Sequence, residues 1–390
     1  MAAPIYLDHA SAAPLRDEVR EAIAPWAGER FGHPGARGHP IGWAAEAAIE
    51  AARAQVADLL GAEPPEIVFT SGGTEADNLA VLGAAGARVG QPRHVIASAV
   101  EGLPVLDAVK RLAREGVETT LLPVDRDGLV AADALAAALR DDTVLVAIQA
   151  ASSEIGTVQD VATLGALCRE RGALLHVDAT AAAPWMRLAL ADAPIDLLSI
   201  TGETLGAPGG IGALYVRRSR PRVRLLPQLV GGAQEGGRRP GFANVLGAVG
   251  LGAACAAVDA HGEVDARTAR DRRDALHETI RSRVTDVALV GHASARLPNH
   301  LALEVRGVEG ESLLVGAPQV AMATGSACSS ATLETSHVLA AIGLDRARAS
   351  TVVRLTTGAE TTAAEIARAA DVLVEAVARL RSFGATSGGA

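Results

Sequence analysis

The sequence predicts an α/β fold, with a large domain built on a mainly parallel seven-stranded sheet and a smaller α+β domain after it. Seven short apolar runs alternate with alanine- and leucine-rich helical stretches through roughly the first two-thirds of the chain. Such alternation is typical of a parallel sheet covered by helices. The 390 residues, 49% of them hydrophobic, are enough to bury a large core and to divide into two domains.

The predicted strands are short apolar runs, as strands buried on both faces usually are. In chain order they cover residues 66–70, 94–100, 118–124, 143–149, 174–180, 196–201 and 212–218. The pattern then changes to a long helical segment from about Val245 to Arg283, strand-like runs at 286–291 and 299–305, and a closing helix at 361–380. We therefore expect a large domain over residues 15–250 and a small domain made of residues 1–14 and 251–390.

Charge and cysteine content exclude several classes of function. The net charge is -9 and basic residues form no stripe, so we expect no nucleic-acid partner. We also expect no membrane span and a cytoplasmic protein, because no apolar run approaches about 18 to 20 residues and the N-terminus lacks a signal pattern. Cys168, Cys255 and Cys328 lie far apart without metal-ligand spacing, which argues against disulfides and against a metal site.

The basic residues are almost all arginine. Of 36 basic side chains, Lys110 is the one lysine, and it belongs to a run with the pattern of an amphipathic surface helix. Codon bias accounts for such a preference on surfaces. A guanidinium stays protonated, so it does not replace an amine where the chemistry requires one.

Several motifs together identify a family resemblance. The run EIVFTSGGTEADNLAV at 66–81 is typical of a strand, a glycine turn and a helix whose first N–H groups face an anion. With IYLDHASAAP, FGHPGARGH, HVDAT, GAPGGIGALYVRR, GSACSSATLETSHVL and VVRLTTGAETT in this order, the chain resembles NifS/IscS-like cysteine desulfurases of the class V aminotransferase-like family. The resemblance implies the pyridoxal-phosphate-dependent transferase fold type I and a homodimer.

The resemblance also assigns roles to individual residues. It implies that cofactor is bound by Gly73, Thr74, Asp178 and Thr201, with Gly73 and Thr74 in the phosphate cradle and Asp178 on the pyridine nitrogen. Arg354 corresponds to the arginine that pairs with the substrate carboxylate, and Cys328 to the persulfide-forming cysteine of a loop. The alternatives are a capped strand end for Asp178, a surface ion pair for Arg354 and an inherited loop without a present task for Cys328.

The chain departs from the family pattern at positions that carry chemistry. Glu203 and Thr204 stand where the family has His-Lys, and a threonine forms no imine. The family lysine also moves the proton at Cα, so a general acid and base is lost as well. The other departures concern a ring-stacking histidine, an asparagine pair, a glutamine and a phosphate-binding threonine from the neighbouring subunit: Gly102, Ser152, Ser153, Ala181 and Phe242.

From these departures we expect a catalytically degenerate homologue, acting as a partner, scaffold or persulfide acceptor through Cys328. We expect no covalently bound cofactor, and pyridoxal phosphate to bind only weakly and noncovalently. A second hypothesis is an enzyme that holds pyridoxal or pyridoxamine phosphate noncovalently, with Glu203 as its base. A third is the inactive subunit of a heterodimer. The partners expected are a second copy of the chain and a sulfur donor or acceptor protein.

Overall fold

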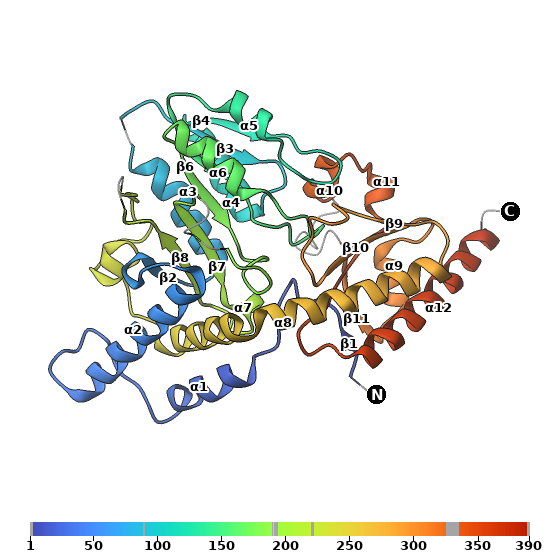
Figure 1. The fold of residues 1–390 in the computed structure, drawn as a ribbon, viewed down its shortest axis with the longest axis horizontal. Helices are drawn as coiled ribbons and strands as arrows, with labels where there is room; N and C mark the ends of the chain where they lie inside the picture. The colour runs from blue at the N-terminus through green and yellow to red at the C-terminus, as the bar shows by residue number, and fades with distance from the viewer. Residues whose placement is uncertain are drawn as a thin grey trace.

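The computed structural model of the chain describes residues 3–88, 90–188, 190, 194–219, 222–324 and 335–387. Its largest sheet contains seven strands, which are β2 Ile67–Thr70, β3 His94–Ser98, β4 Glu118–Leu122, β5 Thr143–Ala147, β6 Leu174–Asp178, β7 Leu197–Thr201 and β8 Gly212–Val216. Their order across the sheet is β2-β8-β7-β6-β5-β3-β4 (Figure 1). Each strand lies within one of the seven predicted runs, so the predicted sheet is confirmed.

One strand of this sheet runs against the others. β3 pairs in parallel with β4 and β5, and β5, β6 and β7 continue the parallel ladder. β8 is antiparallel to both of its neighbours, β7 and β2. Ten residues, 202–211, connect β7 to β8, which is short for the crossover that a parallel pair needs. The sequence pattern did not reveal this reversal, because an apolar run carries no direction.

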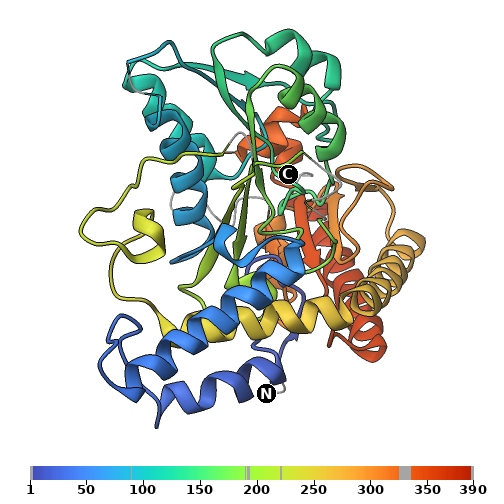
Figure 2. The same cartoon turned by 60° about the vertical axis from the view of Figure 1, so that its left-hand side comes forward.

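Helices cover both faces of the large sheet (Figure 2). On one face lie α3 Gly73–Gly86 and α4 Leu103–Arg114. The core on the other face includes side chains from α1 Asp17–Ala27, α2 Pro40–Leu60, α5 Ala132–Ala138, α6 Val161–Glu170 and α8 Val245–Arg283. Strand residues alternate between the two cores: Val68 joins the first, whereas Ile67 and Phe69 join the second.

A second sheet is formed mostly by the C-terminal part of the chain. It is antiparallel in the order β12-β13-β10-β9, and its strands are β9 Val287–Leu289, β10 His300–Val305, β12 Ala323–Thr324 and β13 Val352–Thr356. β1 Ile5–Tyr6 pairs in parallel with β11 Val320–Ala321. The helices of this part are α9 Gly310–Gly316, α10 His337–Ala341, α11 Arg346–Ala349 and α12 Ala363–Ser387. The N-terminal segment thus lies beside C-terminal strands.

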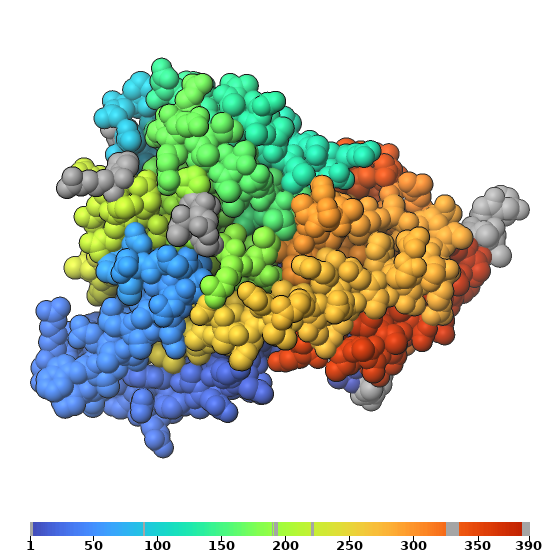
Figure 3. Space-filling model, in the orientation of Figure 1, coloured from blue at the N-terminus to red at the C-terminus, as the bar shows by residue number. Residues whose placement is uncertain are grey.

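The long helix α8 connects the two parts. It forms a continuous band across the face of the molecule in Figure 3, and its bounds match the helical segment expected from the sequence. Within the described residues α8 is the one helix long and apolar enough to cross a membrane, but 56% of its apolar window is buried, and it packs on α1 and α2. It is therefore packed as a core helix. The limits of the two domains stay a prediction.

Candidate functional site

The turn between β2 and α3 forms a cradle for an anion. Gly72 has a φ of +148°, which favours glycine, and a Cβ on Gly73 would lie 2.8 Å from the Cγ2 atom of Thr180. Thr74 follows in the first turn of α3, where backbone N–H groups lack partners within the helix. These donors and the positive end of the helix dipole suit a phosphate. The structure thus places Gly73 and Thr74 together at the start of α3.

Asp178 ends β6 close to this cradle. Its Oδ1 atom accepts hydrogen bonds from the backbone N–H of Thr180 at 2.9 Å and from the Thr180 hydroxyl at 2.6 Å. Burial, and next the neighbouring Asp77 carboxylate, raise the pKa of Asp178 to about 7. A cationic N–H beside this carboxyl group would favour its ionised form and lower that pKa. The carboxyl group is therefore suited to a protonated ring nitrogen.

The end of β7 brings two more of the predicted residues to the same place. Thr201 lies against the cradle, since its Cβ is 3.5 Å from the point that a Cβ on Gly73 would occupy. The Thr201 hydroxyl donates a hydrogen bond to the carboxylate of Glu203. The Thr204 hydroxyl donates to the carbonyl oxygen of Thr180 at 2.6 Å. Positions 203 and 204 therefore present a carboxylate and a hydroxyl group beside the cradle.

Arg354, in the middle of β13, is buried in a cluster of polar groups. Its Nη2 atom donates to Oδ1 of Asp8 at 2.8 Å and to the hydroxyl of Ser11 at 2.6 Å. Its Nη1 atom donates to the carbonyl oxygen of Ser153 at 3.1 Å, and its Nε atom is buried and has no hydrogen-bond partner among the described residues. The alternative reading of Arg354 as a surface ion pair does not apply, because the side chain is only 7% exposed.

The segment 152–154 connects Arg354 to the rest of the site. The Ser153 carbonyl that binds Arg354 also accepts a hydrogen bond from Nε2 of His300 at 2.9 Å. The hydroxyl of Ser152 accepts from the backbone N–H of Glu154 and so stays within its own turn. Burial raises the pKa of Glu154 to about 7, although a hydrogen bond from Ser336 and the charge of Arg354 oppose this shift.

The other residues that depart from the family pattern either leave open space at the site or point away from it. A Cβ on Gly102 would lie 3.6 Å from Oδ2 of Asp178, so this glycine borders the site without filling it. Ala181 is partly buried against the core. The Phe242 ring is exposed and stacks on His33 of its own chain, with ring centroids 5.1 Å apart.

The cysteines and the lysine occupy different environments. Cys168 and Cys255 are buried, and burial raises the pKa of Cys168 to about 12 and that of Cys255 further. Cys328 lies outside the described residues. Lys110 is exposed on α4 and pairs with Asp107 at 2.9 Å. Over the described ranges, no group of three or more His, Cys, Asp or Glu side chains is arranged to hold a metal ion.

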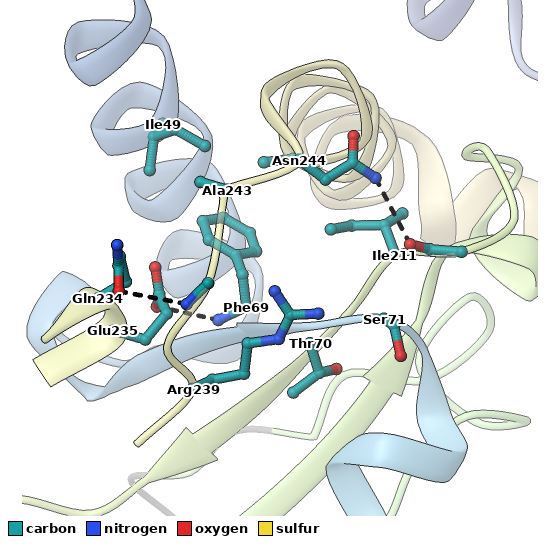
Figure 4. Close-up of a pocket in the computed structure, with 13 residues that line it drawn as sticks. Ile49, Phe69, Thr70, Ser71, Ile211, Gln234, Glu235, Arg239, Ala243 and Asn244 are labelled. Atoms are coloured by element: carbon teal, nitrogen blue, oxygen red, sulfur yellow. Dashed lines mark hydrogen bonds between the residues drawn. The ribbon is translucent and has the colours of Figure 1, made fainter. Parts of the chain in front are cut away.

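A small pocket adjoins the cradle and was not foreseen from the sequence (Figure 4). Thr70 and Ser71 line it on one side, and the segment 234–244 lines it on another. That segment is held by two ion pairs: Glu235 binds Arg53, and Arg239 binds Glu75 at 3.0 Å. It reads as a glycine-rich loop in the sequence, and its partners lie far away along the chain. No local pattern therefore reveals these contacts.

Known proteins resemble this chain over nearly its full length. A family model described as aminotransferase class-V matches residues 5–368. Cysteine desulfurase IscS of Salmonella schwarzengrund (strain CVM19633) is 42% identical over 385 residues, which are 98% of this chain and 95% of the relative. Among solved structures, a NifS-like protein has a TM-score of 0.89 and 28% identity, with 96% and 99% of the two chains covered. A structure of SspA in complex with cysteine has a TM-score of 0.80 and 31% identity, with 92% and 99% covered.

These similarities confirm the resemblance and overturn the expectation about the cofactor. They point to a family that depends on pyridoxal phosphate and binds it covalently, so the expectation of weak, noncovalent binding is wrong. That expectation rested on the substituted positions and took too little account of the family motifs that the chain retains. The cradle at Gly73 and the raised pKa of the partly buried Asp178 fit the phosphate and the ring nitrogen of this cofactor.

Proposed function

The chain belongs to the aminotransferase class-V family, and from this premise we propose that it is a sulfur-transfer protein that receives sulfur on Cys328 from a partner. It does not release sulfur from L-cysteine by itself. Membership supports the sulfur-transfer role, since its relatives include cysteine desulfurases. The proposal that the chain does not cleave L-cysteine rests on the residues at the end of β7.

The observation that carries the proposal is the pair of side chains at positions 203 and 204. Pyridoxal phosphate supplies an electron sink for chemistry at Cα of an amino acid. Cleavage also requires a base that removes the Cα proton, and an effective base has a pKa near the working pH. The Thr204 hydroxyl does not titrate near neutral pH and is already bonded to the carbonyl oxygen of Thr180. The Glu203 carboxylate accepts a hydrogen bond from the Thr201 hydroxyl and is directed toward it.

Sulfur acceptance needs only a thiolate and an incoming sulfane sulfur. The thiolate of Cys328 attacks the terminal sulfur of a persulfide on the donor protein, a new S–S bond forms, and the donor thiolate leaves with the electron pair of the broken S–S bond. No external oxidant or reductant enters this exchange. Cys168 and Cys255 are unsuited to it, because burial keeps both thiols protonated.

A homodimer is part of the same proposal. Two segments expose large apolar side chains, which include Phe31, Trp43, Val230 and Phe242. The two segments meet where His33 stacks on Phe242. Exposed apolar groups gathered in this way commonly mark a protein interface. We expect a second copy to cover them, and light scattering of the purified protein measures this directly.

The test has two parts on the purified protein supplied with pyridoxal phosphate. With L-cysteine alone, we expect no sulfide above the background of a Thr204→Ala variant. With L-cysteine and a catalytic amount of an active cysteine desulfurase, we expect one added sulfur atom on Cys328 by mass spectrometry of its peptide, and none after Cys328→Ser. Robust sulfide release by the protein alone would instead establish an enzyme.

A further inference from the structure

Asp77 lies one turn of α3 beyond the cradle, on the side of the helix that packs against the large sheet. Residues four apart on a helix share a face, and Gly73, four residues before Asp77, already lies against Thr180 and Thr201. Asp77 is only 2% exposed, and its Oδ1 atom has no hydrogen-bond partner among the described residues. A buried carboxyl group without such a partner is unfavourable, which indicates a role beyond packing.

An imidazole connects Asp77 to the residue that ends β6. His176 and Asp178 lie on the same face of the sheet, because alternate residues of a strand share a face. Nε2 of His176 lies 3.4 Å from Oδ1 of Asp77 and 2.9 Å from the hydroxyl oxygen of Ser199. Ser199 in turn pairs with Asp178 across β6 and β7. Asp77, His176 and Asp178 therefore form one polar group on the α3 side of the sheet.

The charges in this group act on Asp178 with different strength. Burial, and next the Asp77 carboxylate, raise the pKa of Asp178. Hydrogen bonds from Thr180 and the charge of His176 lower it, and the effect of His176 is smaller than that of Asp77. The Asp77–His176 pair thus presents mainly its negative end to Asp178.

The other acids near this group do not supply the same charge. Glu101 is fully buried, and burial raises its pKa well above 4.5, although the backbone N–H of Gln149, which donates to it at 2.7 Å, opposes this shift. Glu101 therefore favours its protonated, neutral form. Glu203, at the end of β7, is directed toward a neighbouring threonine hydroxyl. Asp77, beside an imidazole, is the acid suited to stay ionised near Asp178.

We propose that Asp77 is a positioning residue that acts through Asp178, because its negative charge helps to keep a proton on the ring nitrogen of the cofactor that Asp178 binds. Two carboxylates attract a cationic N–H more strongly than one does, and in a protein interior the second acts without direct contact. A protonated ring is the better electron sink. The inference goes beyond sulfur acceptance, since it concerns the cofactor site and does not depend on Cys328.

The test is the protonation of the ring nitrogen, measured on the full chain supplied with pyridoxal phosphate that carries ¹⁵N in its ring. The chemical shift of this nitrogen distinguishes its protonated from its neutral form and is followed over a series of pH values. Asp77→Asn keeps the shape of the side chain and removes its charge. We expect it to lower the pH at which the ring nitrogen loses its proton by about one unit, a tenfold loss in proton affinity.

Three further variants make the outcome decisive. Asp77→Ser, which is smaller and also neutral, should give the same shift, so the result does not depend on how well one variant folds. Glu101→Gln replaces an acid that favours its neutral form, and Asp107→Asn removes an exposed carboxylate on α4; both should leave the titration of the ring nitrogen unchanged. The inference is overturned if neither Asp77 variant moves this titration, or if either control variant moves it as far.

Discussion

Replacing Glu235 by alanine should lower the free energy of unfolding by about 3 kcal/mol. Glu235 binds Nη1 and Nη2 of Arg53 at 2.7 and 2.8 Å, and it accepts the backbone N–H of Phe69 on the edge strand β2 at 3.0 Å. The two charged side chains are only 10% and 11% exposed. Breaking a buried ion pair on one side costs about 3 to 5 kcal/mol, and the exposed Glu50 still pairs with Arg53, which favours the lower figure.

A surface pair provides the control for this variant. Arg111 on α4 and Glu115, the residue that follows this helix, also approach to 2.9 Å, but their side chains are 60% and 52% exposed, and pairs of this kind contribute about 0 to 1 kcal/mol. Urea unfolding of Glu235→Ala and Glu115→Ala at pH 7, extrapolated to water, compares the two. If the losses in the free energy of unfolding differ by less than about 1 kcal/mol between the two variants, the view that Glu235 stabilises the edge strand of the large sheet is refuted.

Three further predictions concern the cradle, a buried acid and the cysteines. Gly73→Ala places a methyl group 2.8 Å from a neighbouring threonine methyl and should cost about 1 to 3 kcal/mol in thermal or urea unfolding, whereas Gly209→Ala, with open space around it, should be near neutral. Glu154 has a pKa raised from 4.5 to about 7, so the native state holds more protons than the unfolded one between these values. Stability should fall as pH rises through this window, by up to about 1.4 kcal/mol per pH unit, and Glu154→Gln should lack this slope; an unchanged slope contradicts the assignment. Iodoacetamide should modify Cys168 and Cys255 only after denaturation, and rapid labelling of either in the native protein would show that it is not buried as described.

Much of the fold could be predicted because its signals are local. A strand buried on both faces must be apolar along its length, so β5 and β7 are visible as continuous runs in the sequence. Strand direction is different, since it depends on the connection between strands. The reversal of β8 follows from the short segment 202–211 and not from the residues of the strand itself.

The site was predictable only where a family motif marks it. Gly73, Asp178 and Arg354 lie in such motifs, and the structure gives each the surroundings described above. The partners of Arg354 could not be found in this way, because Asp8 and Ser11 are more than 340 residues away in the sequence. The expectation about the cofactor was wrong for a related reason. Substitutions such as Thr204 were considered one at a time, without the surrounding family motifs that the chain retains.

The central claim is that Cys328 receives sulfur while the chain does not cleave L-cysteine. Mass spectrometry of the Cys328 peptide, after incubation with L-cysteine in the presence and absence of an active cysteine desulfurase, tests it most directly. Added sulfur that appears only when the desulfurase is present agrees with the claim. Added sulfur or free sulfide produced by the chain alone contradicts it.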